Sequence, residues 1–101
     1  MGDVGPGGRV CAEVEVVNPL GMHARPAAML VQTAGRYPCD VWIEKGGVRV
    51  NAKSVMGLLM LAAARGVQLR IVCDGEQSAE ALQAVLTLFD DGFGEMDGAL
   101  P

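Results

Sequence analysis

The only histidine of this 101-residue chain, His23, lies two residues after a glycine and directly before a segment with helical periodicity. The first N–H groups of a helix have no intrahelical acceptor, and the helix dipole adds partial positive charge there. This environment favours a neutral imidazole with a nitrogen lone pair available for nucleophilic attack. Because the same amides bind anions such as phosphate, the position indicates reversible phosphoryl transfer through His23, without a metal or cofactor.

Two neighbours of the histidine suit the same chemistry. Arg25 would add a charge-assisted hydrogen bond to a phosphoryl group on the ring. Pro26 fits the first helical turn, where its missing N–H leaves no bond unmade. The alternative is a solvated histidine that only caps the helix, with Arg25 and Met22 as surface and packing residues. Spacing alone does not separate the two interpretations.

Ser54 precedes a second apolar segment and is expected to cap a short helix from Val55 to about Ala63, which Gly66 ends. That segment has more large apolar side chains than one buried face requires. Either all of them are core residues, or some form an exposed docking patch in which flexible methionines adapt to several partners. The candidates for such a patch are Met22, Met56 and Met60.

Composition excludes several classes of function. Eight Lys+Arg against twelve Asp+Glu give a net charge of −4, which argues against binding to nucleic acid or to an anionic membrane. The longest apolar stretch, Val55–Ala64, is about half of the roughly twenty residues that a membrane span needs. No charged and then apolar leader indicates secretion.

Three widely spaced cysteines, Cys11, Cys39 and Cys73, include no C-x-x-C pair. They favour reduced thiols in a cytoplasmic protein over a disulfide framework or a zinc site. With one histidine beside them, they also supply no nucleophile–base pair at a recognisable spacing, so a metal- or thiol-dependent enzyme is disfavoured.

The elements that must position these residues alternate between the periodicity of β-strands and that of α-helices. Strands are predicted over 10–17, 37–45, 48–51 and 67–72, with a hairpin turn at Gly46-Gly47, and the first helix is predicted to run from Ala24 to a C-cap at Gly35. A third helix follows from the spacing of Leu82, Val85, Leu86 and Phe89. Because each element is apolar on one side only, we expect an α+β domain over 10–95, with helices on one face of a four-stranded sheet. The glycine-rich residues 1–9 are predicted to be a flexible leader, the segment 90–101 to fray, and 96–101 to form a flexible tail.

Three segments resemble one known family. Leu20-Gly-Met-His-Ala-Arg-Pro is similar to the active-site signature of HPr, the histidine-containing phosphocarrier of the bacterial phosphoenolpyruvate-dependent phosphotransferase system. Asn51-Ala-Lys-Ser-Val-Met-Gly-Leu-Leu-Met-Leu resembles the regulatory-serine helix of that family, and Gly92-Phe-Gly-Glu is a third match. The resemblance spans residues 11–95, with the segments in the family's order.

The resemblance implies an open-faced β-sandwich of four antiparallel strands and three helices. His23 would be phosphorylated on Nδ1 by enzyme I and would pass the group to an enzyme IIA component of a sugar permease or a regulatory branch, with Arg25 stabilising it. Ser54 would be phosphorylated by an HPr kinase/phosphorylase, which adds about two negative charges to a docking surface on the first two helices. The chain would then be a cytoplasmic carrier and not an enzyme. The alternative is a regulatory HPr-like module that acts through phospho-Ser54.

Overall fold

The computed structural model describes residues 8–96, and the parts of the predicted leader and tail at 1–7 and 97–101 lie outside the described residues. The elements are β1 (Arg9–Glu15), α1 (Ala24–Ala34), β2 (Asp40–Lys45), β3 (Val48–Asn51), α2 (Val55–Leu61), β4 (Gln68–Asp74), α3 (Ser78–Asp90) and a 3₁₀ turn (Gly92–Gly94). Their order from β1 to α3 is the one that the sequence periodicity predicts.

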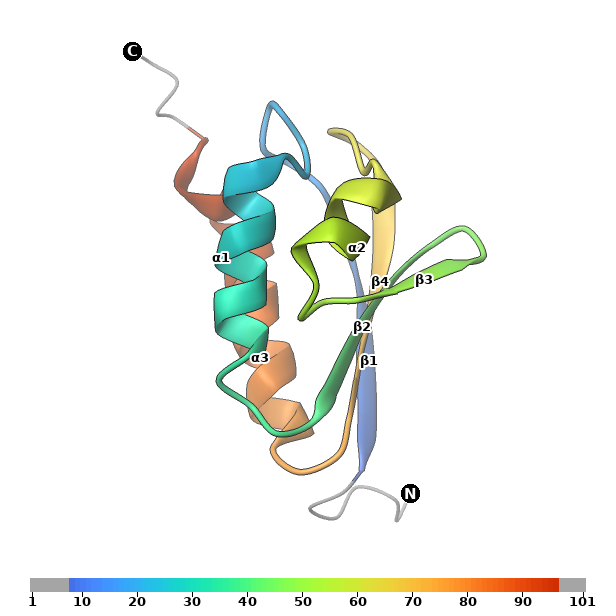
Figure 1. The fold of residues 1–101 in the computed structure, drawn as a ribbon. Helices are drawn as coiled ribbons and strands as arrows, with labels where there is room; N and C mark the ends of the chain where they lie inside the picture. The colour runs from blue at the N-terminus through green and yellow to red at the C-terminus, as the bar shows by residue number, and fades with distance from the viewer. Residues whose placement is uncertain (1–7, 97–101) are drawn as a thin grey trace.

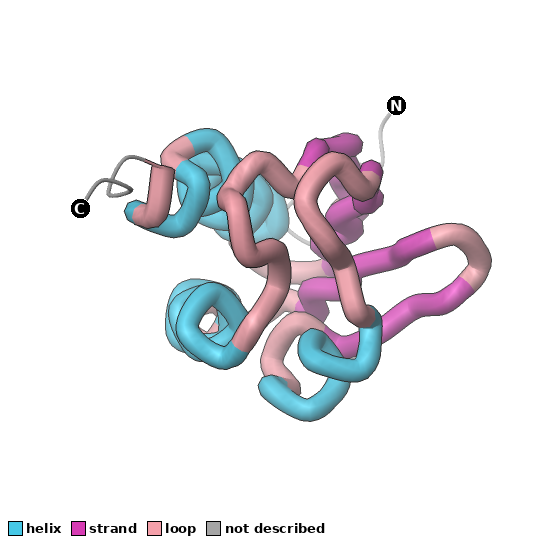
Figure 2. The backbone as a smooth tube through the Cα atoms, turned by 90° about the horizontal axis from the view of Figure 1, so that it is seen from above, coloured by secondary structure: helices cyan, strands magenta, loops and turns pink. Residues whose placement is uncertain are grey.

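The four strands form one antiparallel sheet in the order β1-β4-β2-β3, so that β4 lies between β1 and β2. The helices cover one face of this sheet, with α1 beside α3 and α2 next to α1 (Figure 1). Seen from above, the helices lie on one side of the strands (Figure 2). The predicted fold class, an α+β open-faced β-sandwich, is confirmed.

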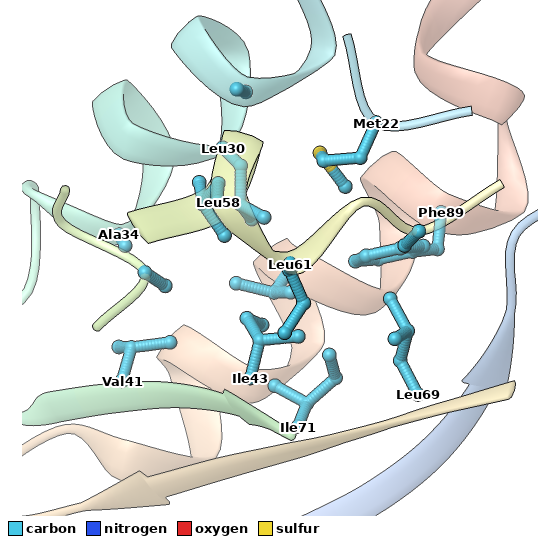
Figure 3. Close-up of a cluster of buried hydrophobic side chains, with 14 of the residues drawn as sticks. Met22, Leu30, Ala34, Val41, Ile43, Leu58, Leu61, Leu69, Ile71 and Phe89 are labelled. Atoms are coloured by element: carbon cyan, nitrogen blue, oxygen red, sulfur yellow. The ribbon is translucent and has the colours of Figure 1, made fainter. Parts of the chain in front are cut away.

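The core lies between the helices and the covered face of the sheet. Leu30 of α1 and Leu58 of α2 point toward Ile43 and Ile71 on the two central strands (Figure 3), and all four side chains are fully buried. Each such burial stabilises the fold by about 1.5–3 kcal/mol. This packing fixes the end of α1 at which His23 lies.

Several boundaries differ from the sequence-based prediction. Strand β1 begins at Arg9 rather than Val10, and β2 begins at Asp40 rather than Tyr37. Helix α2 ends at Leu61, because Ala62 adopts the left-handed conformation with φ of 52°. The prediction that Gly66 ends this helix is therefore wrong.

The segment after α3 is packed against the helix, so the predicted fraying is wrong for residues 90–95. Phe93 is 1% exposed, and its ring meets that of Phe89 edge-on, with centroids 4.9 Å apart. The backbone of Phe93 is left-handed, with φ of 56°, which turns the chain back after α3. Burial of this aromatic ring holds the following residues, including Glu95, in a defined position.

Candidate functional site

His23 occupies the N-cap of α1. Its backbone is extended, with φ of −94°, and its carbonyl accepts the first helical hydrogen bond from Ala27 N–H at 3.0 Å. The imidazole forms no capping hydrogen bond to the helix, and the side chain is 35% exposed. The ring therefore does not serve as the helix cap, and a partner protein can reach it.

The loop before His23 packs tightly against the segment after α2. Gly21 has a φ of +67°, and a Cβ at this position would lie 2.6 Å from the carbonyl oxygen of Ala63. The backbone N–H of Met22 donates to the same carbonyl at 2.9 Å, and its side chain is only 6% exposed. Met22 is thus a core residue that anchors the loop, and its prediction as part of an exposed docking patch is wrong.

Glu95 supplies the partner of the histidine ring. Its Oε2 lies 2.9 Å from Nε2 of His23, although the two residues are 72 positions apart in the sequence. The Glu95 side chain is 14% exposed, so water screens this contact only in part. In Figure 1 the C-terminal segment that carries Glu95 lies beside the first turn of α1.

Asn18 holds the other oxygen of the same carboxylate. Its Nδ2 donates to Oε1 of Glu95 at 2.9 Å and to the carbonyl of Gly21 at 2.8 Å. The residue types and spacing of Asn18 and Glu95 predict no role for either residue. The only signal was the match of Gly92-Phe-Gly-Glu, which marks Glu95 but not the residue that it contacts.

This geometry decides which ring nitrogen of His23 is available. An ionised carboxylate has only acceptors, so Nε2 must be the nitrogen that carries the proton in a hydrogen bond to Glu95. In the neutral ring the other nitrogen, Nδ1, then keeps its lone pair. The arrangement can therefore present Nδ1 as a nucleophile and balance positive charge on the ring with the carboxylate.

Arg25 and the helix amides lie on the same turn. Arg25 is exposed on the first turn of α1, two residues after the histidine. The N–H groups of Ala24 and Arg25 have no acceptor within the helix, and Pro26 has no N–H. The predicted anion-binding elements are thus present at the end of α1 that carries His23.

Ser54 is the N-cap of α2, as predicted. Its Oγ accepts a hydrogen bond from Gly57 N–H at 3.1 Å, and the residue is half-buried. Helix α2 lies next to α1 (Figure 1), so Ser54 and His23 belong to neighbouring helices on the same side of the sheet.

The exposed face of α2 is apolar. Met56 and Met60 are 67% and 77% exposed, and the other large apolar side chains exposed on this helix are Val55 and Leu59. We call these four residues the α2 apolar patch. Two of the three predicted docking residues, Met56 and Met60, therefore lie on the surface, whereas Leu58 and Leu61 of the same helix are buried.

Among residues 8–96, the cysteines are free thiols, and no group of three His, Cys, Asp or Glu side chains is arranged to hold a metal ion. Cys11 is exposed, whereas Cys39 and Cys73 are buried. Burial raises the pKa of the Cys73 thiol to about 12 and also raises that of Cys39. Within the same residues no helix has the length and apolar character needed to cross a membrane.

Comparison with known proteins gives a consistent result. The family described as the PTS HPr component phosphorylation site matches residues 10–91. The phosphocarrier protein HPr of Neisseria meningitidis is 45% identical over 82 residues, which cover 81% of this chain and 92% of that protein. The HPr-like protein Crh of Bacillus subtilis is 48% identical over 71 residues, covering 70% and 84% of the two chains.

Solved structures show the same likeness. The crystal structure of HPr-C-His from Thermoanaerobacter tengcongensis superposes with a TM-score of 0.83 at 38% identity, over 85% of this chain and 97% of that one.

Proposed function

Because this chain belongs to the HPr family of phosphotransferase-system phosphocarrier proteins, we propose that Nδ1 of His23 accepts a phosphoryl group from enzyme I and passes it to an enzyme IIA component. The observation that carries the assignment of the atom is the contact between Nε2 and Glu95. It occupies one ring nitrogen with a carboxylate and leaves the other as the nucleophile.

In the proposed step, the Nδ1 lone pair attacks the phosphorus of the phosphorylated donor. The Nδ1–P bond forms while the bond from phosphorus to the donor atom breaks, and its electron pair stays on the donor. The proton on Nε2 remains in place, so the phosphorylated ring carries a positive charge beside Glu95. The reverse sequence, with an acceptor side chain of the IIA component as nucleophile, regenerates His23.

Three groups support the phosphorylated state. The carboxylate of Glu95 would balance the charge on the ring, and the first backbone N–H groups of α1 would donate to the phosphoryl oxygens at the helix end. Arg25 adds a charge-assisted hydrogen bond to the phosphoryl oxygens. The chain therefore acts as a carrier that is regenerated in each cycle, with no cofactor.

The α2 apolar patch supports docking of protein partners to the same side of the molecule. Met56 and Met60 have flexible side chains that can repack against different surfaces. We assign enzyme I and the IIA component to this surface and place the carrier in the cytoplasm, where it would serve sugar transport.

The test is phosphorylation by purified enzyme I and phosphoenolpyruvate, followed by intact-mass measurement. We expect one acid-labile phosphoryl group on the wild-type chain, none on His23→Ala, and loss of the group when a IIA protein is added. Normal labelling of His23→Ala would refute the assignment, as would a wild-type chain that stays unlabelled.

A second function, regulation through Ser54, rests on a separate observation. Ser54 is half-buried at the start of the helix that carries the α2 apolar patch, and its segment resembles the family's regulatory-serine helix. A phosphate there would add about two negative charges beside an apolar docking surface and weaken binding. The HPr kinase/phosphorylase would supply it from ATP.

Incubation with that kinase and ATP tests this second function. We expect an acid-stable phosphate that is absent from Ser54→Ala and that slows transfer from enzyme I. An acid-stable phosphate with no transfer through His23 would instead favour a purely regulatory HPr-like module.

A further inference from the structure

Asn18 is a buried residue whose side-chain amide is held in one orientation by its hydrogen bonds. It is 1% exposed and lies in the loop between β1 and α1. Both hydrogens of its amide are used, one on the carbonyl of Gly21 and one on Oε1 of Glu95, at 2.8 Å and 2.9 Å. Together with the bond from His23 Nε2 to Oε2, these contacts form a chain from the loop to the ring.

The direction of the Asn18 amide is set by its neighbours. A reversed amide would place Oδ1 against two acceptors, the Gly21 carbonyl and the Glu95 carboxylate, with no hydrogen between them. In the observed direction Oδ1 is buried without a hydrogen-bond partner among the described residues. An unpaired buried acceptor is unfavourable, so the orientation in which the Asn18 amide donates both hydrogens costs free energy at Oδ1.

We propose that Asn18 is a positioning residue that makes a carboxylate obligatory at residue 95, and thereby keeps the proton of the His23 ring on Nε2. This role rests on the proposed function of His23 and extends the site to Asn18, which does not touch the reacting atoms. Asn18 presents a donor to residue 95, so whatever side chain stands there must turn an acceptor toward Asn18. A carboxylate has a second acceptor left for His23, whereas an amide does not.

Glu95→Gln therefore has a specific consequence. Its carbonyl oxygen would face Asn18, and its NH₂ group would face Nε2 of His23. Because an NH₂ group can only donate, Nε2 would become the acceptor and the ring proton would move to Nδ1. Nδ1 would then lose its nucleophilic lone pair, although the His23 side chain itself is unchanged.

The test compares Glu95→Gln with Glu95→Ala, using ¹⁵N chemical shifts of the His23 ring in the unphosphorylated protein. We expect the Nε2–H tautomer in the wild type and the Nδ1–H tautomer in Glu95→Gln. Glu95→Ala is the matched control, since it removes the carboxylate but imposes no donor on Nε2. If the His23 ring keeps the Nε2–H tautomer in Glu95→Gln, the proposal is overturned, because the new glutamine amide would then have turned its carbonyl toward His23 regardless of Asn18.

Phosphoryl transfer from enzyme I supplies the kinetic readout. In a Ser-His-Asp triad, replacing the carboxylate by an amide lowers kcat by about 10⁴-fold through the wrong tautomer. We expect the same direction here, with Glu95→Gln slower than Glu95→Ala by about tenfold or more. Equal rates, or a faster Glu95→Gln, would contradict the proposal.

The double variant Asn18→Ala/Glu95→Gln tests Asn18 itself. Without the Asn18 donor, the glutamine amide can rotate and offer its carbonyl to His23, so the Nε2–H tautomer and part of the rate should return. A double variant that folds, as judged by thermal unfolding, and stays in the Nδ1–H tautomer would overturn the role of Asn18. If the double variant does not fold, the tautomer of the His23 ring in Glu95→Gln alone decides whether the proposal stands.

The positioning role of Asn18 and the proposed function of His23 can be tested separately. The ring tautomer is measured without any partner, so an inverted tautomer in Glu95→Gln would support the positioning role even if enzyme I did not phosphorylate the wild type. That second result would refute only the proposed function.

Discussion

The carboxylate of Glu95 lies 2.9 Å from Nε2 of His23 across 72 residues of sequence. This contact joins the segment after α3 to the start of α1 and distinguishes the two ring nitrogens, since only Nε2 contacts the carboxylate. Its geometry depends on the packing of the C-terminal turn, on the loop that Gly21 and Met22 anchor, and on the position of α1 over the sheet. Phosphoryl transfer should therefore be sensitive to substitutions of residues that never touch phosphate.

Phe93 anchors the turn that carries Glu95, so Phe93→Ala should affect both stability and transfer. Loss of this buried ring should lower the free energy of unfolding by about 3–5 kcal/mol. Denaturant unfolding measures that change, and the ¹⁵N shifts of His23 report whether the Glu95 contact survives in the folded fraction. Val85→Ala is the control, since Val85 is fully buried in α3 and would destabilise the fold without releasing Glu95. If the ¹⁵N shifts of the His23 ring in Phe93→Ala were the same as in the wild type, the turn that carries Glu95 would not be what holds the contact between Glu95 and His23.

Charge in the α2 apolar patch should weaken partner binding without affecting the fold. Met60→Glu, at a side chain that is 77% exposed, should raise the Kd for enzyme I by about tenfold, as for an interface residue worth more than 1 kcal/mol. Its stability should stay within about 0.5 kcal/mol of the wild type. Val48→Glu is the matched control, because Val48 is an exposed apolar residue at the β2–β3 hairpin. Equal weakening by both variants would argue against a specific docking surface, as would no effect of Met60→Glu.

Ser54 contributes a cap in addition to its proposed regulation. Ser54→Ala removes the acceptor of the Gly57 N–H and should lower the free energy of unfolding by about 1 kcal/mol. Ser54→Asp keeps a capping oxygen, so it should restore most of that stability while placing a negative charge beside the α2 apolar patch. We expect slower transfer from enzyme I in Ser54→Asp than in Ser54→Ala. Unchanged transfer in Ser54→Asp would argue against charge as the regulatory element.

The cysteines should differ in reactivity. Thiolates are the reactive form, and burial raises the pKa of Cys73 to about 12 and that of Cys39 above its usual value. At about pH 8, iodoacetamide should therefore label the exposed Cys11 first and the other two only after unfolding. Peptide mass mapping checks the order, and rapid labelling of Cys73 in the native protein would contradict the burial.

The same thiols predict a pH dependence of stability. In the unfolded chain Cys73 ionises near its ordinary pKa of about 8.5, well below its value in the folded protein. Its contribution to stability is thus fully present below about pH 8.5 and is lost as the pH rises toward 12. Cys73→Ser should show a smaller loss of stability across this range in denaturant unfolding, and an unchanged pH slope would contradict the assignment.

The local patterns of the sequence were sufficient for most of the fold. Alternation along 10–17 predicts β1, and its inward residues are those that the structure buries or half-buries. The helical start near Ala24 and the cap at Ser54 also follow from local chemistry, because caps and prolines act on their nearest neighbours. The family resemblance added the antiparallel arrangement, which the structure confirms.

The remainder depends on contacts between distant segments. The bond from Asn18 to Glu95 spans 77 positions. No residue type or spacing marks Asn18 as part of a site, and the match of Gly92-Phe-Gly-Glu does not indicate which residues Glu95 contacts. The glycines that follow α3 favour fraying, whereas burial of Phe93 packs the described part of this segment against the helix. A flexible methionine side chain suits an exposed docking surface, whereas Met22 is 6% exposed and its backbone N–H donates to the carbonyl of Ala63.

We infer that Glu95 occupies Nε2 of His23 and leaves Nδ1 to bond phosphorus. The most direct measurement is ³¹P–¹⁵N coupling in the ¹⁵N-labelled protein after phosphorylation by enzyme I and phosphoenolpyruvate. We predict a coupling between phosphorus and Nδ1 of His23, with a proton retained on Nε2. A coupling to Nε2, or a phosphoryl group on any other residue, would contradict the account.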